Sequence, residues 1–215
     1  MMRPVSARWG TVRDCSSLSG DILEVDAADC KAGRLPAAGG LDLPGETGRW
    51  IMALQGWMAD AFCKERAWRE LLLKVAGIRC DAVSEDKRGL LIFDWIMVTV
   101  LGSLQPCADA HGFGAAWSRM ISDRSGTAAS EAMLAASAAA DSSRNARNGV
   151  VAAHASSAAA AATCSVIDYS GVIADSAARA LMACGEVATV DDAWKRFDPL
   201  GLLRLLVITG AERRI

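Results

Sequence analysis

Apolar residues in the first half of the chain recur every three or four positions, the spacing that places side chains on one face of an α-helix. Charged residues such as Asp60, Lys64 and Arg69 fill the positions between them. The pattern predicts one amphipathic helix that begins near Glu46 and ends at Gly77. Its apolar face would consist of Trp50, Leu54, Trp57, Ala61, Trp68, Leu71, Leu72 and Val75.

A second helix is predicted over residues 87 to about 105. Apolar residues surround almost its whole circumference, and Asp94 is the one charged residue in the run 90–104. A helix that is apolar on all sides is normally buried on all sides, so we expect a buried central helix. Asp86 is suited to cap its start, and Pro106 would lie beyond its end. The run is shorter than the roughly twenty residues that a membrane span needs.

A further helix is expected over 109–122, followed by an alanine-rich stretch over 127–184. Alanine has the highest helix propensity, and recurring large apolar residues distinguish this stretch from a low-complexity linker. Small side chains let helix axes approach to the short end of about 8–10 Å, which predicts close-packed antiparallel hairpins. Asn148 and Gly149 indicate a break between two helices. Residues 168–171 indicate a second break or a tolerated kink.

The two ends of the chain differ from this body. A C-terminal helical unit is expected over 190–210, with Asp191 or Asp192 as the cap and Pro199 in the first turn of a restarted helix. Residues 1–45 hold six glycines and three prolines, which predicts an irregular arm with one candidate short strand at 22–25.

Together these patterns predict an all-α protein, a multi-helix bundle attached to an irregular arm. Residues 1–45 would form the irregular arm or a small subdomain, and residues 46–215 the helical domain. Within the domain we distinguish tryptophan-rich helices over 46–124, alanine-rich helices over 127–184 and the C-terminal unit over 190–210.

Composition narrows the function. A hydrophobic fraction of 52% is enough to build a core, and 23 basic against 25 acidic residues give no general attraction to nucleic acid. The start of the chain lacks the apolar stretch of a secretory signal, so we expect a cytoplasmic protein with no membrane segment.

Seven cysteines are present, and no two form a C-x-x-C pair. Their separations match no zinc-binding spacing, so we predict free thiols in a reducing compartment and neither a metal site nor a cofactor.

Few residues are candidates for catalysis. Asp94, Cys107 and His111 could form a dispersed site between helices, with the Cys107 thiol activated near a helix start. Each also has a structural interpretation: a carboxylate that pairs with arginine or lies on an exposed stripe, a buried thiol, and a histidine in a turn. His154, between two alanines, fits a surface or interface histidine.

The tryptophans suggest either a core or a binding surface. On a single helix, Trp50, Trp57 and Trp68 would share one face, as core residues or, together with the nearby Arg66 and Arg69, as an interface. Tryptophan and arginine are both over-represented at binding hot spots.

Three functional hypotheses follow. The favoured one is a non-enzymatic protein–protein interaction protein, for example a bacteriophage or mobile-element inhibitor that binds a host defence complex. The second is an enzyme that uses Asp94, Cys107 and His111. The third is a structural subunit of a homo-oligomer, since the apolar C-terminal segment must dock on the body or on a partner.

Overall fold

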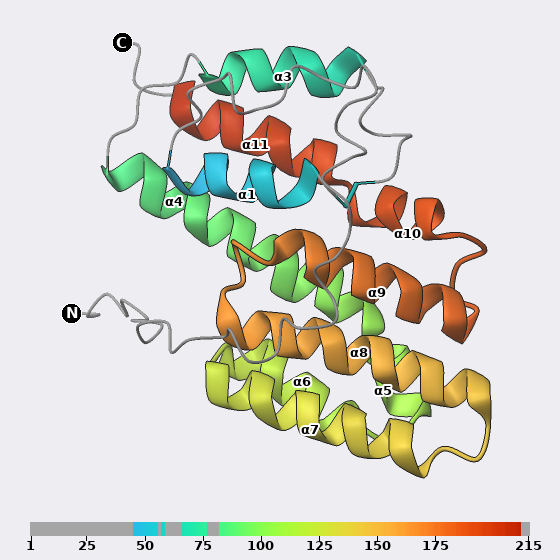
Figure 1. Cartoon of the computed structure of the whole chain (residues 1–215). Helices are drawn as coiled ribbons and strands as arrows, with labels where there is room; N and C mark the ends of the chain where they lie inside the picture. The colour runs from blue at the N-terminus through green and yellow to red at the C-terminus, as the bar shows by residue number, and fades with distance from the viewer. Residues whose placement is uncertain (1–44, 56, 59–65, 77–81, 212–215) are drawn as a thin grey trace. The chain divides into compact units, whose positions relative to one another are not determined.

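The computed structural model of the protein describes residues 45–55, 57–58, 66–76 and 82–211, and it is all-α over these ranges (Figure 1). The predicted fold class is thus confirmed: several helices pack together, and the described residues contain no strand. The candidate strand at 22–25 and nearly all of the expected arm lie outside the described residues.

The first amphipathic segment forms two helices, α1 (Gly45–Gln55) and α3 (Arg66–Ala76). The prediction of one continuous helix was wrong. The backbone N–H groups of Trp57 and Met58 both bond to the carbonyl of Leu54 at 2.9 Å, which closes a turn directly after α1. Glycine occupies position 56, and glycine weakens a helix interior by roughly 1 kcal/mol relative to alanine.

The central helical segment is longer than expected and changes its winding on the way. It begins as α4 (Ala82–Asp94), becomes the π-helix η4 (Trp95–Leu101), passes through the 3₁₀ turn η5 (Gly102–Leu104) and ends as α5 (Gln105–Ala110). Asp86 therefore lies inside the helix instead of capping it. Pro106 does not end it either, because proline is tolerated in the first turn of α5, where its missing N–H has no intrahelical partner.

This segment is central, but it is not buried on every side. Ile92, Ile96 and Val100 are fully buried, whereas Leu90 and Val98 are more than half exposed. The predicted burial on all sides was therefore wrong. Residues Val83–Ala110 are long and apolar enough to cross a membrane, a property that core helices of soluble proteins share. Here the segment packs against α1 and against the C-terminal helices α9 and α11, described next.

The alanine-rich region forms closely packed hairpins, as predicted from its small side chains. After α6 (Gly114–Asp123), the helices α7 (Gly126–Ser142), α8 (Ala146–Cys164) and α9 (Ser170–Cys184) lie side by side in sequence order (Figure 1). The break predicted at Asn148 and Gly149 falls instead at 143–145, because the side chain of Asn145 caps α8 by accepting from the N–H of Arg147 at 2.9 Å. The second predicted break is present, just before α9.

The C-terminal unit consists of α10 (Val190–Phe197) and α11 (Pro199–Ala211), with the restart at Pro199 as predicted. The cap of α10 is Thr189, whose hydroxyl accepts from the N–H of Asp192 at 3.1 Å, and not Asp191 or Asp192. Both aspartates lie in the first turn, where negative charge also favours the helix dipole. Helix α11 packs against α3 and α4 (Figure 1).

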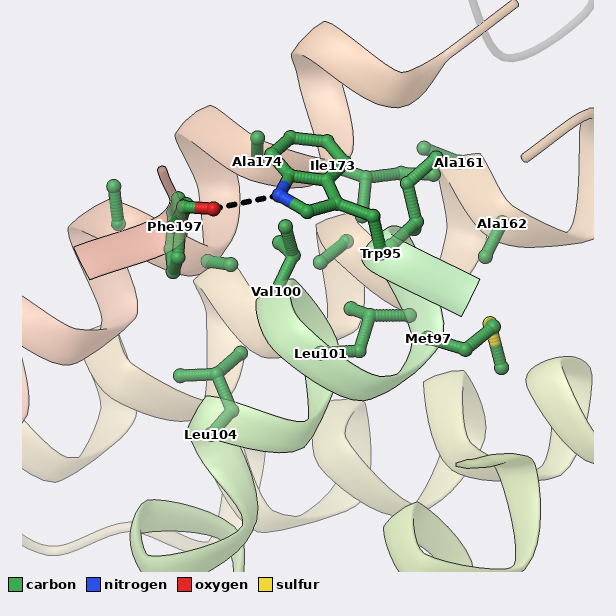
Figure 2. Packing of buried hydrophobic residues seen from close by; sticks show 14 of the residues in the cluster. Trp95, Met97, Val100, Leu101, Leu104, Ala161, Ala162, Ile173, Ala174 and Phe197 are labelled. Carbon is green, nitrogen blue, oxygen red and sulfur yellow. Dashed lines mark hydrogen bonds between the residues drawn. The ribbon is translucent and has the colours of Figure 1, made fainter. Parts of the chain in front are cut away.

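The core joins the central segment to the C-terminal helices. Trp95 of the π-helix lies close to Ile173 and Ala174 of α9 and to Phe197 at the end of α10 (Figure 2). This packing places the first turn of the π-helix beside the connection between α10 and α11, where a groove opens to solvent.

Candidate functional site

An open groove of about 820 Å³ lies between the central segment and α11. We call it the α11 groove. The central segment contributes Leu91, Asp94, Trp95, Val98 and Thr99; the end of α6 contributes Arg124; and the C-terminal unit contributes Arg196, Phe197, Asp198, Gly201, Leu202, Arg204 and Leu205.

One side of the groove is the π-helix. The N–H of Gly102 bonds to the carbonyl of Met97, five residues earlier, which is the spacing of π-helical winding. This winding is rare and occurs frequently at functional sites. Here Trp95 points into the core while Val98, three residues later, is 54% exposed in the groove.

The groove exposes apolar side chains from both sides. Val98 of the π-helix is 54% exposed, and Leu205 of α11 is 52% exposed. Burying such a side chain is worth about 1.5–3 kcal/mol relative to leaving it in water. Leu202 and Trp95 line the same groove but are largely buried already, so Val98 and Leu205 have the most apolar surface left to cover.

An ion pair lies along the groove. Asp94 accepts from Arg124 at 2.5 Å, and Arg124 also lies over the ring of Phe93, 5.8 Å from its centroid. The two charged side chains are 51% and 41% exposed, so the pair contributes at most about 1 kcal/mol to stability. Both structural interpretations of Asp94 are therefore met: it lies on an exposed stripe and it pairs with an arginine.

Two further arginines in the groove have no such partner. Arg196 and Arg204 are exposed and form no ion pair with any carboxylate of the described residues. The nearby Asp198 caps α11, because its Oδ1 accepts from the N–H of Gly201 at 2.9 Å. The groove thus combines apolar surface with two guanidinium groups that have no ion-pair partner among the described residues, and with the negative charge of Asp198.

No pattern in the sequence predicts these arginines. They are distant from Asp94 in sequence. The packing of α6 and α11 against the central segment brings Arg124, Arg196 and Arg204 to the groove. No spacing within the chain signals such a site.

The structure brings two of the proposed catalytic residues, Cys107 and His111, to the same thiol, that of Cys184, and leaves Asp94 apart from them. Cys107 follows Asp94 by thirteen residues, which corresponds to roughly 20 Å along a helix. His111 lies nearer to Cys107, at the end of α5, and its Nε2 is 4.0 Å from the Sγ of Cys184. Burial and a hydrogen bond to Cys184 raise the pKa of the Cys107 thiol, so the thiolate that nucleophilic catalysis needs is disfavoured.

The tryptophans proposed as core or interface belong to the core where the structure describes them. Trp50 and Trp68 are fully buried and pack with ring centroids 6.3 Å apart, although they lie on two helices. Trp57 is half-buried against the same core. The side chains of Arg66 and Arg69 lie outside the described residues.

Comparison with protein-family models, characterised proteins and solved structures gives no match for the chain. The chemistry of the site therefore has to be inferred from its own residues. Over the described ranges, no group of histidine, cysteine and carboxylate side chains is arranged to hold a metal ion. What the α11 groove offers is apolar contact and positive charge, which suits binding.

Proposed function

We propose that the chain is a non-enzymatic protein–protein interaction protein and that its partner binds in the α11 groove. The observation that carries this proposal is the combination in one groove of two half-exposed apolar side chains, Val98 and Leu205, with Arg196 and Arg204, which form no ion pair with any other described residue. Interfaces are commonly built this way, with apolar side chains at the centre and arginine among the enriched residue types.

The alternative enzyme hypothesis has less support. Asp94 pairs with Arg124, and the pKa of the Cys107 thiol is raised. His111 lies 4.0 Å from the Sγ of Cys184, the thiol to which Cys107 is hydrogen-bonded. That distance is longer than the roughly 2.6–3.2 Å expected between a nucleophile and its general base.

The inhibitor hypothesis is one form of the proposal. A phage or mobile-element protein that acts by binding a host defence complex needs a docking surface and no catalytic residues. It predicts that the activity of the bound complex falls when this chain is added, whereas an adaptor would leave that activity unchanged.

We also propose that the protein is soluble and cytoplasmic. The support is the packing of the segment Val83–Ala110 inside the bundle and the ion pair between Glu85 and the buried Arg88 within it. Recovery of the intact chain in the soluble fraction after cell lysis is the expected result, and recovery in washed membranes would contradict it.

The partner is tested by purification of tagged full-length protein from its native host. The wild type and a Leu134→Asp variant should recover the same stoichiometric partner, because Leu134 is 63% exposed on α7, away from the groove. Val98→Asp and Leu205→Asp should lose it. A clean wild-type monomer with no partner would count against the proposal, and a homo-oligomer would favour the structural-subunit hypothesis.

A further inference from the structure

We propose that the α11 groove binds an acidic amphipathic helix of the partner protein. This inference rests on the proposed function and specifies the chemistry of the partner segment. The argument depends on the helical sides of the groove, on the apolar side chains exposed there and on the charge that surrounds them.

The sides of the groove favour a helix as the bound segment. Both are themselves helical, since Val98 comes from the π-helix and Leu205 from α11. A third helix laid over the two would pack against both, at the usual distance between helix axes of about 8–10 Å. Such a helix presents apolar anchors at intervals of three, four and seven residues, and Val98 and Leu205 supply the apolar surface that receives them.

The charge of the groove favours binding of an acidic helix. Three arginines and two aspartates line it, so positive charges outnumber negative ones by one. Asp94 pairs with Arg124, whereas the carboxylate of Asp198 caps α11 and keeps its charge. Arg196 and Arg204 are left without an ion-pair partner among the described residues, and their guanidinium groups are suited to bidentate contact with carboxylates. Aspartate or glutamate residues beside the apolar anchors would supply those contacts.

A nucleic acid fits the same residues less well. Binding of single strands relies on exposed aromatic rings on which bases stack. The aromatic side chains that line the groove, Trp95 and Phe197, are 7% and 0% exposed, and the whole chain has a formal net charge of −2. An anionic membrane would require a protruding apolar surface, whereas this surface is concave.

Site-specific photocrosslinking tests the inference. A benzophenone amino acid replaces Val98, Leu205 or, as a control, Leu134 in the full-length chain, which is then irradiated in its native host. We expect the first two positions to crosslink to one partner segment that is rich in Asp and Glu and has apolar residues at helical spacing. The Leu134 position should not crosslink to that segment.

The possible results separate the two proposals. Crosslinks from Val98 and Leu205 to a basic segment, to nucleic acid, to lipid or to a second copy of this chain would overturn the acidic helix. Crosslinks from the Leu134 position alone would be consistent with a protein–protein interaction protein but would show that its partner does not bind in the groove. No adduct from any position, together with no co-purified partner, would reject the proposed function itself.

Charge reversal supplies an independent measurement. A synthetic peptide of the crosslinked segment is titrated against the wild type, an Arg196→Glu/Arg204→Glu double variant and an Arg144→Glu control. Arg144 is exposed in the turn between α7 and α8, outside the groove. We expect the double variant to bind about tenfold more weakly or worse, and the control to bind as the wild type does. Equal affinity of all three proteins would overturn the role of the two arginines.

Discussion

The indole Nε1 of Trp95 donates a hydrogen bond of 2.6 Å to the carbonyl oxygen of Phe197, 102 residues later in the chain (Figure 2). The last carbonyls of a helix have no partner within it, and Phe197 is the last residue of α10. The bond therefore satisfies a buried acceptor and fixes the π-helix to the connection that leads into α11. Both residues line the α11 groove.

The first prediction concerns this bond. Trp95→Phe retains an aromatic ring but leaves the Phe197 carbonyl without its donor, so the free energy of unfolding should fall by about 1–3 kcal/mol. Binding of the partner should weaken as well, because the π-helical side of the groove would no longer be fixed to the connection between α10 and α11. Denaturant unfolding and a binding titration measure the two effects.

Trp117 provides the matched control. Its Nε1 donates to the carbonyl of Leu101 at 2.9 Å, in the same buried geometry but away from the groove. Trp117→Phe should destabilise the protein by a similar amount and leave partner affinity unchanged. Equal losses of affinity in both variants would mean that Trp95 acts only through global stability.

The second prediction compares two glycines within helices. A Cβ atom at Gly171 would lie 2.5 Å from Cδ1 of Trp57 and would also clash with the backbone carbonyl of Ala53, so Gly171→Ala should destabilise the fold by about 1–3 kcal/mol. At Gly149 the nearest atom would be 3.6 Å away, an ordinary contact. Gly149→Ala should therefore raise the free energy of unfolding by up to about 1 kcal/mol, because alanine has the higher helix propensity.

These two glycines also show what the sequence could and could not predict. Helical periodicity and alanine content correctly predicted the all-α class and the close-packed hairpins, because both depend on local pattern. Gly149 was predicted to break a helix, although Asn145 caps α8 four residues earlier. The role of Gly171 depends on contact with Ala53 and Trp57, more than a hundred residues away, which no local pattern encodes.

The same distinction applies to the candidate site. Asp94 was identified from its sequence because a charge within an apolar run is conspicuous. Its partner Arg124 and the exposure of Val98 were not predictable, since they depend on the π-helical winding and on where α6 and α11 pack. The predicted catalytic group combined Asp94 with Cys107 and His111, which follow it by thirteen and seventeen residues along one helical segment, so Asp94 cannot reach them.

The third prediction concerns the buried arginine of α4. Arg88 is 1% exposed and pairs with Glu85, while its Nε and Nη2 have no partner in the described structure. Glu85→Ala would leave the guanidinium uncompensated and would also remove the acceptor for the N–H of Glu46. We expect a loss of about 3–5 kcal/mol in the free energy of unfolding.

Arg88→Met is the informative comparison. It removes the buried charge and its unpaired donors, so stability should change little or increase. Chemical denaturation of both variants decides the question. A larger loss for Arg88→Met than for Glu85→Ala would show that the guanidinium is stabilised by contacts beyond Glu85.

The fourth prediction is a pH dependence. Burial lowers the pKa of His154, and the positive charge of Arg179 lowers it further against the opposing effect of Asp175. The unfolded chain therefore binds a proton more readily than the folded one, so stability is full above the ordinary histidine pKa of about 6.5 and falls as pH drops below it. Between about pH 7.5 and about pH 5, His154→Gln should lose less stability than the wild type. Identical pH profiles would contradict this.

The last prediction separates binding from thiol catalysis. Cys107 is 1% exposed, and burial raises its thiol pKa, whereas Cys164 and Cys184 are half-buried. In the native protein at neutral pH, an alkylating reagent should modify Cys107 more slowly than either of the other two, and the difference should vanish in denaturant. Mass spectrometry of timed digests measures the three rates. If Cys107 reacted fastest, its thiolate would be stabilised by groups that the packing does not show, and the enzyme hypothesis would replace the binding one.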